Sequence, residues 1–193
     1  MRHDLRLAAF PAVDPAGDPA RDASLVEAAR GGDEDAFGRL YQAYFRMVHG
    51  ILLVRVPRDD VDDLAQDVFL QAWNRLTTLR DAAAFGGWLA MITRNRAADH
   101  HRRAAPVTEL PEDLAAPSSR HSEAALALAA LRTLPPAYGE TLVLRLVEGM
   151  SGPEIAARTG LTPGSVRVNL HRGMKLLRQK LGLEAVGGDA GEE

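Results

Sequence analysis

The chain of 193 residues contains no cysteine, which excludes disulfide frameworks, thiol catalysis and zinc or iron–sulfur centres held by cysteine. No apolar run reaches the ~18 residues needed to span a bilayer, so no membrane insertion is expected. Residues 1–23 lack the apolar segment of a secretory signal, and a cytoplasmic location is consistent with both absences. The sequence has no HExxH motif, phosphate-cradling glycine loop or nucleophile–base pair. It therefore predicts no metal, no cofactor and no enzymatic activity.

Aromatic residues are also scarce, at 5%, whereas Ala, Leu, Arg, Asp and Glu are abundant. With 46% hydrophobic residues the chain can form a packed core. Apolar positions such as Phe37, Leu40, Tyr41 and Tyr44 follow a helical period, and no strand-like alternation is visible. The sequence predicts an all-α fold of two small helical domains, an N-terminal helical bundle and a C-terminal helix-turn-helix, joined by a flexible linker.

Proline, glycine and charge place the domain boundaries. We expect a flexible extension, a first domain, a linker rich in proline and acid, a second domain and an acidic tail. Their bounds are 1–23, 24–103, 104–122, 123–182 and 183–193.

Within the first domain, Ser24 and Glu27 match a capping box that would begin the first helix after Ser24. Asp60 begins a third helix. A fourth helix spans 85–103, and residues 76–84 are expected to form a loop before it.

The net charge of −3 conceals a strong segregation of charge along the chain. Residues 161–180 contain five Lys or Arg and no acid, and residues 94–103 contain four Arg. Acids gather in residues 59–67 instead. Blocks of opposite sign indicate separate surfaces for separate partners, although solvated helix faces would give the same pattern.

The acidic segment 59–73 has an inner apolar stripe and an outer polar one. It lacks the calcium-loop spacing of acids and a glycine. Favourable interaction with the helix dipole accounts for Asp59 and Asp60, but Asp63 and Asp67 lie farther along the helix. The segment is therefore either a docking face for a basic partner helix or a solvated surface. The outward residues are Asp62, Asp63, Gln66, Asp67, Leu70 and Asn74.

The helix at 85–103 is basic toward its C-terminus and follows the loop that contains Arg80. Arginine and asparagine beside a loop can hold a single nucleic-acid strand through phosphates and base edges. The alternative is that the cations only interact with the dipole at the end of the helix.

The segment 151–178 has the features of a helix-turn-helix. Ser151 and Glu154 form a capping box, Gly160 lies at the turn and Thr162 caps the second helix. One face of that helix is polar and basic, as a recognition helix in the major groove requires. A helical hairpin that binds no DNA is the alternative. The exposed face is expected to carry Ser165, Arg167, Val168, His171, Arg172 and Lys175.

Three segments in this order, 59–73, 85–103 and 134–181, resemble bacterial RNA polymerase sigma factors of the extracytoplasmic-function (ECF) type. The resemblance covers about residues 24–181, and residues 1–23 fall outside it. It implies a subunit that binds core RNA polymerase, at the coiled coil of the largest subunit and at the flap. It also implies promoter DNA as a partner, recognition of the −35 and −10 elements with stabilised melting, and control by an anti-sigma factor.

The resemblance assigns roles to individual residues. Asp63, Gln66 and Asp67 match docking positions, and Asp62, Leu70 and Asn74 share their face. Val168 and Asn169 depart from the residue types common in the family. The expected −10 contacts are Arg80, Arg94, Asn95, Arg96, Asp99, Arg102 and Arg103. The expected −35 contacts are Ser165, Arg167, Val168, Asn169, His171, Arg172 and Lys175.

The alternative function is a two-domain helix-turn-helix regulator that binds DNA independently of core polymerase, as a dimer on a palindromic site. We expect instead a monomer when free, with weak binding to promoter duplex until core polymerase is added. Light scattering and a gel-shift titration check this prediction. A dimer, or tight sequence-specific binding by the chain alone, would support the alternative.

Overall fold

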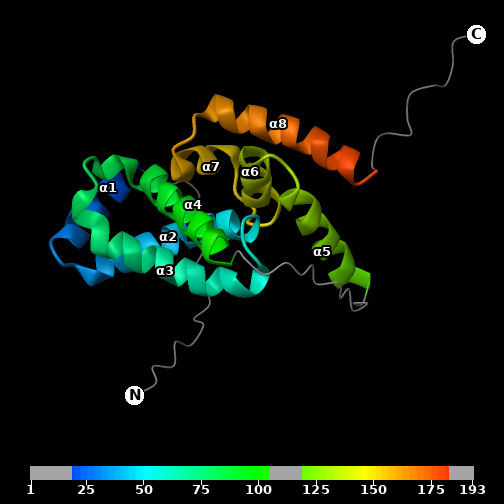
Figure 1. The fold of residues 1–193 in the computed structure, drawn as a ribbon. Coiled ribbons are helices and arrows are strands. Elements are labelled where there is room, and N and C mark those ends of the chain that lie inside the picture. Colours follow the sequence, from blue (N-terminus) through cyan, green and yellow to red (C-terminus); the bar gives the residue numbers. More distant parts are fainter. Residues whose placement is uncertain (1–18, 105–118, 183–193) are drawn as a thin grey trace, which may run out of the picture.

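The computed structural model describes residues 19–104 and 119–182, which are helical apart from short turns (Figure 1). This confirms the predicted all-α class. The first half contains α1 (Pro19–Arg30), α2 (Glu34–Leu53), α3 (Val61–Arg75) and α4 (Phe85–Ala104). The second half contains α5 (Ser119–Arg132), α6 (Pro136–Leu146), α7 (Gly152–Thr159) and α8 (Pro163–Lys180). Short 3₁₀ helices occupy Arg58–Asp60, Leu76–Thr78 and Ala82–Ala84.

The helices α1–α4 form a bundle around α2. Leu40, Met47 and Ile51 repeat along one side of α2 and are fully buried, as are Phe85 and Leu89 on α4. Burial of each such side chain contributes about 1.5–3 kcal/mol, which is enough to override weak local helix propensity. The core therefore fixes the orientation of α3 and α4, the two helices that carry the predicted docking and −10 residues.

The first helix begins at Pro19, so the prediction of a helix capped by Ser24 is wrong. Ser24 lies in the interior of α1 and is exposed. A tertiary contact accounts for the earlier start, because buried Asp22 in the first turn accepts a hydrogen bond of 2.7 Å from the Tyr44 hydroxyl. Burial, together with this bond, raises the pKa of Tyr44, so the tyrosine remains a donor.

Other boundaries also differ from the prediction. α4 extends to Ala104 and α5 begins at Ser119, so the interval between the two halves is shorter than the predicted linker 104–122. The predicted loop at 76–84 contains two 3₁₀ helices. The predicted acidic tail, most of the N-terminal extension and residues 105–118 lie outside the described residues.

The helix-turn-helix is formed by α7 and α8, and its predicted caps are confirmed. The backbone N–H of Glu154 donates to the Ser151 hydroxyl at 3.3 Å, and the Glu154 carboxylate accepts from the Ser151 N–H at 2.8 Å. Gly160 adopts a left-handed φ of 73° at the turn, and Thr162 accepts from the N–H of Ser165 at 3.1 Å. The caps fix where each helix begins and therefore which side chains α8 exposes.

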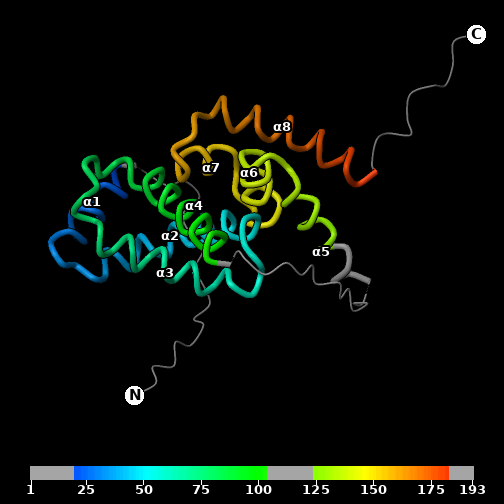
Figure 2. The backbone as a smooth tube through the Cα atoms, in the orientation of Figure 1, coloured from blue at the N-terminus to red at the C-terminus, as the bar shows by residue number. Residues whose placement is uncertain are grey.

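The two halves pack against each other (Figure 2). α6 lies against α2, and α7 lies against α4 and α2. Buried residues of both halves, including Ile51 and Leu144, belong to one hydrophobic cluster. Gly50 permits the approach of α2 and α6, because a Cβ there would lie 2.8 Å from a methyl group of Leu144. Two domains were predicted from the sequence, but nothing in it indicated that they would share a core.

We expect Ser151→Ala to lower the free energy of unfolding by about 1 kcal/mol, the usual cost of removing a serine cap. The exposed Ser24→Ala is the matched control, and it should be neutral or slightly stabilising because Ser24 lies inside α1. Urea unfolding followed by circular dichroism measures both. A larger loss from Ser24→Ala than from Ser151→Ala would contradict the capping assignment.

The capping box of Ser151 and Glu154 also makes the free energy of unfolding depend on pH. Burial acts to raise the pKa of Glu154, but hydrogen bonds from Ser151 and the charges of Arg158 and Arg46 outweigh it and hold the pKa below its ordinary value. A lowered pKa in the folded state adds stability above the ordinary pKa of glutamate, which is lost as pH falls through the folded-state value. The stability difference between wild type and Ser151→Ala should therefore narrow below about pH 4.5.

Candidate polymerase-docking and nucleic-acid interfaces

One face of α3 carries all six predicted docking residues. Val61, Leu64 and Val68 are buried against the bundle, which turns the opposite side of the helix to solvent. Leu70 is 61% exposed at the centre of an acidic and amide surface. An apolar side chain left this exposed on a polar face is typical of a contact site. The exposed face consists of Asp62, Asp63, Gln66, Asp67, Leu70 and Asn74.

The N-terminus of α3 differs from the prediction. The α-helix begins at Val61, so Asp63 lies in its first turn, where the dipole favours an acid. Asp60 occupies the N-cap position but makes no capping hydrogen bond. Its carboxylate instead lies 3.2 Å from Nε2 of His100 on α4. Favourable interaction with the helix dipole therefore accounts for Asp62 and Asp63. It does not account for Gln66, Asp67 or Leu70, which lie farther along the helix.

The predicted −10 residues fall into two groups. Arg80, Asn95, Arg102 and Arg103 are exposed and lie on or beside α4. Half-buried Arg94 instead contacts Glu140 of α6, with Nε 3.0 Å and Nη2 3.0 Å from Oε2.

Three further residues of this set are also paired, namely half-buried Arg96 and Asp99 and exposed Arg102. Arg96 donates to Asp67 of the docking face, and Arg102 donates to Asp99 one turn away along α4. The Arg96–Asp67 pair joins a predicted DNA contact to a predicted polymerase contact. Part of the cationic face is therefore engaged within the protein.

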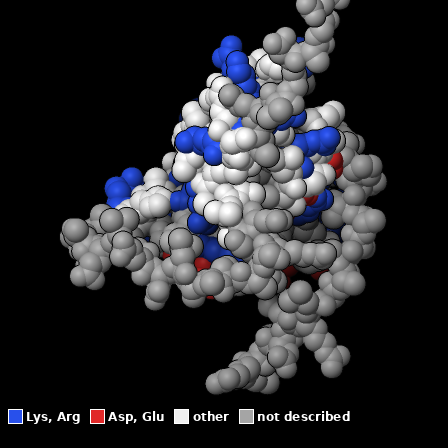
Figure 3. Space-filling view, turned by 90° about the vertical axis from the view of Figure 1, so that its right-hand side faces the viewer, with Lys and Arg blue, Asp and Glu red and all other residues white. Residues whose placement is uncertain are grey.

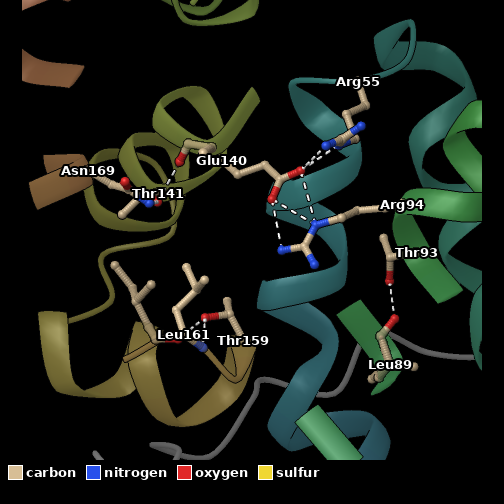
Figure 4. Close-up of polar contacts among 11 residues, drawn as sticks. Arg55, Leu89, Thr93, Arg94, Glu140, Thr141, Thr159, Leu161 and Asn169 are labelled. Atoms are coloured by element: carbon tan, nitrogen blue, oxygen red, sulfur yellow. Dashed lines mark hydrogen bonds and ion pairs between the residues drawn. The ribbon is translucent and has the colours of Figure 1, made fainter. Parts of the chain in front are cut away.

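The recognition helix α8 exposes most of its predicted −35 contacts. Val166, Gly173 and Leu177 are buried against α6 and α7, and Val168 on the other side is 43% exposed. Asn169 is half-buried, and its amide donates to Oγ1 of Thr141 on α6 at 3.3 Å (Figure 4). Helical periodicity did not place Asn169 on the exposed face, and Asn169 was counted among the −35 contacts only through the family resemblance. The exposed set is Ser165, Arg167, Val168, His171, Arg172 and Lys175.

A groove of about 1180 Å³ runs along α8. Apolar Leu146, Leu170 and Met174 line it, and Arg145 and Arg178 are among the cations at its margins. Figure 3 looks onto the end of the molecule where α5 and the end of α8 lie. Lys and Arg there surround uncharged surface, and Asp and Glu are sparse. Arg145 was not predicted, because only the packing of α6 beside α8 places it there.

Comparison with known proteins decides between the functions left open. Residues 40–106 match the family model for Sigma-70 region 2, and residues 124–177 match the model for Sigma-70, region 4. The ECF RNA polymerase sigma factor BldN of Streptomyces coelicolor is 35% identical over 187 residues, covering 89% of this chain and 69% of BldN. The chain belongs to the ECF family of RNA polymerase sigma factors.

Two further relatives agree with this assignment. The RNA polymerase sigma factor CarQ of Myxococcus xanthus is 35% identical over 167 residues, covering 81% of this chain and 95% of CarQ. The structure of CnrH in complex with the cytosolic domain of CnrY superposes with a TM-score of 0.60 at 28% identity, covering 86% of this chain and 99% of that chain.

This ECF sigma factor directs transcription initiation, and its family is non-enzymatic. The half formed by α1–α4 corresponds to region 2 and the half formed by α5–α8 to region 4. Within the described ranges, no helix is both long and apolar enough to cross a membrane. The same ranges contain no group of three or more His, Cys, Asp or Glu arranged to hold a metal ion.

Proposed function

We propose that the sigma factor divides its partners between faces of opposite charge. The exposed face of α3 binds core polymerase, the end of α4 holds the unpaired −10 strand, and α8 reads the −35 duplex. The proposal rests mainly on one observation, that α3 exposes an acidic face with Leu70 at its centre while α8 exposes a cationic face. We also propose a cytoplasmic location, because the proposed partners, core polymerase and promoter DNA, are cytoplasmic.

The docking face suits a basic helical partner such as the coiled coil of the largest polymerase subunit. Exposed Leu70 supplies an apolar anchor, and Asp63 and Asp67 give the charge that steers and orients the partner. Arg167 and Lys175 also line the groove along α8, so the groove belongs to the DNA-reading surface. The flap of core polymerase is proposed as a second contact elsewhere on the half formed by α5–α8. Contacts on both halves let core polymerase set the distance between the two DNA-reading surfaces.

The two DNA surfaces have different chemistry. On α8, Arg167 can donate to a guanine edge and exposed Val168 can contact a thymine methyl group, while Lys175 meets phosphate. On α4, Asn95 and Arg103 are exposed and can hold base edges and phosphates of a single strand. Capture of the unpaired strand stabilises the melted state over the duplex.

An anti-sigma factor is a further proposed partner. The structure of CnrH was solved with the cytosolic domain of CnrY, and this chain covers 99% of CnrH. By this similarity we propose that this sigma factor binds a protein inhibitor, an anti-sigma factor. We also propose that the free chain is a monomer.

We expect Asp63→Arg to abolish binding to core polymerase, because it reverses a charge at the docking face. The matched control is Asp35→Arg, since Asp35 is likewise an exposed first-turn acid, on α2. Both substitutions lose the same dipole interaction, so their stability should fall equally. Co-elution with purified core polymerase measures binding, and the assignment fails if the two variants bind alike.

Arg167→Ala should change the preference for the upstream promoter element, because a bidentate arginine contact discriminates bases by about 1–3 kcal/mol. Asn169→Ala should leave that preference unchanged, because its amide is bonded to Thr141. Transcription in vitro with core polymerase on a pool of promoters measures both. An unchanged preference with Arg167→Ala, or a change with Asn169→Ala, would contradict the orientation of α8.

A further inference from the structure

Glu140 joins region 4 to region 2 through a buried carboxylate. Glu140 lies on α6 and is 6% exposed. Its Oε1 accepts from Nε of Arg55, just beyond α2, at 2.5 Å, and its Oε2 accepts from Nε and Nη2 of Arg94 on α4, both at 3.0 Å (Figure 4). We call these three residues the Glu140 latch.

The latch depends on closure of the two halves. A buried carboxylate is unfavourable unless charged donors replace its lost hydration. Both donors come from region 2, 85 and 46 residues away in the chain. When the halves separate, all three groups regain water. The pairing therefore stabilises only the closed arrangement of the two halves.

Other polar contacts cross the same interface. Glu148 beyond α6 accepts from Nδ1 of His49 on α2 at 2.8 Å. Arg158 of α7 is buried, donates to the carbonyl of Ala43 and lies over the ring of Tyr44 at 5.6 Å from the centroid. These charged contacts lie beside the apolar contacts that the two halves share, such as Ile51 with Leu144 in one cluster. Interfaces between domains of one chain are more polar than obligate interfaces, so the halves can move relative to each other.

The backbones also meet at the interface. A Cβ on Gly86 would lie 2.4 Å from the carbonyl oxygen of Arg158, and a Cβ on Gly160 would lie 3.1 Å from the Cα of Gly87. The start of α4 and the end of α7 can approach only because glycine occupies these positions. A single methyl group at Gly86 is incompatible with the closed contact.

In the closed arrangement, α4 and α8 lie too close together to contact both elements of one promoter. The positions −35 and −10 lie roughly 25 base pairs, or about 85 Å, apart on B-form DNA. α7 packs against both α4 and α8, and two successive helix packings separate the two reading helices by only about 20 Å. Arg94, one of the predicted −10 contacts, is moreover occupied by Glu140.

We propose that the Glu140 latch holds the free sigma factor in a closed resting state in which the carboxylate of Glu140 takes the place of a DNA phosphate at Arg94. Opening releases Arg55 and Arg94 and lets the two regions separate to the spacing of the promoter elements. This inference rests on the proposed function only for the role of Arg94 in DNA binding. The closure itself does not depend on it.

Spin-label distance measurements on the full chain test the closure. The chain has no cysteine, so Gln42→Cys and Gln179→Cys, both at exposed helical positions, can be labelled without background. Wild type should give one narrow distance distribution. Glu140→Gln and Gly86→Ala should each add a population with longer and more broadly distributed distances. Glu140→Gln removes the negative charge that pairs with Arg55 and Arg94, and Gly86→Ala adds a methyl group that clashes with the carbonyl oxygen of Arg158. The control Gly38→Ala should match wild type, because a Cβ at Gly38 meets nothing within 4 Å.

Binding of a fluorescein-labelled 20-nucleotide single strand of random sequence tests the release of Arg94. If about one tenth of wild-type molecules are open, Glu140→Gln and Gly86→Ala should bind up to about tenfold more tightly than wild type, and the full gain is reached when the variant is entirely open. Glu34→Gln removes an exposed negative charge elsewhere and controls for net charge. Gly86→Ala changes no charge at all.

The outcomes separate the two claims. A broad wild-type distribution, or unchanged distances in both Glu140→Gln and Gly86→Ala, would overturn the latch whatever the DNA results. Opening without a gain in single-strand binding would overturn the masking of Arg94 while leaving the closure established. Failure of the proposed docking would instead appear with Asp63→Arg and core polymerase, an assay that does not involve the latch.

Discussion

The arrangement of the two regions depends on placing one carboxylate between two guanidinium groups. Glu140 is buried on α6, where Arg55 and Arg94 face its carboxylate. Removal of one partner from a buried ionic group is far more costly than the net value of the group, so the three residues form and separate as a unit. The position of α6 over α2 follows from this requirement together with the shared apolar cluster and the close approach at Gly50.

The distribution of charge explains how a chain with a net charge of −3 can work on DNA. Cations gather on α4 and α8, and five acids gather in residues 59–67 at the start of α3, so local fields differ from the average. Several of these cations are paired internally, including Arg96 with Asp67 and Arg94 with Glu140. Fewer cations available to phosphate mean weaker nonspecific binding, which favours a protein that acts through polymerase rather than alone.

Local signals predicted the local structure well. Ser151, Glu154, Gly160 and Thr162 act within a few residues of one another, and the caps and turn they predicted are confirmed. Helical periodicity likewise identified the buried side of α3. The start of α1 was missed because it depends on the Asp22–Tyr44 contact, which joins residues 22 positions apart.

The candidate sites were predicted as faces but not as pairings. Nothing in the sequence near Arg94 or Asn169 indicates that one meets Glu140 and the other Thr141, since these partners are 46 and 28 residues away. The one available signal was an acid at position 140 among apolar residues, and that signal indicates a buried partner without identifying it.

The chemistry of this interface is suited to a closed state that can still open. An interface made only of buried apolar side chains would lose its whole burial energy on opening, because separated apolar faces gain nothing from water. Glu140, Glu148 and Arg158 all recover hydration when the halves part, which offsets much of what closure contributes. The closed and open states then differ by little enough for a partner to choose between them, because a ligand shifts an equilibrium only by its difference in affinity for the two states. Core polymerase contacts that require separated regions would favour the open state, and an inhibitor that spans both regions in contact would favour the closed one.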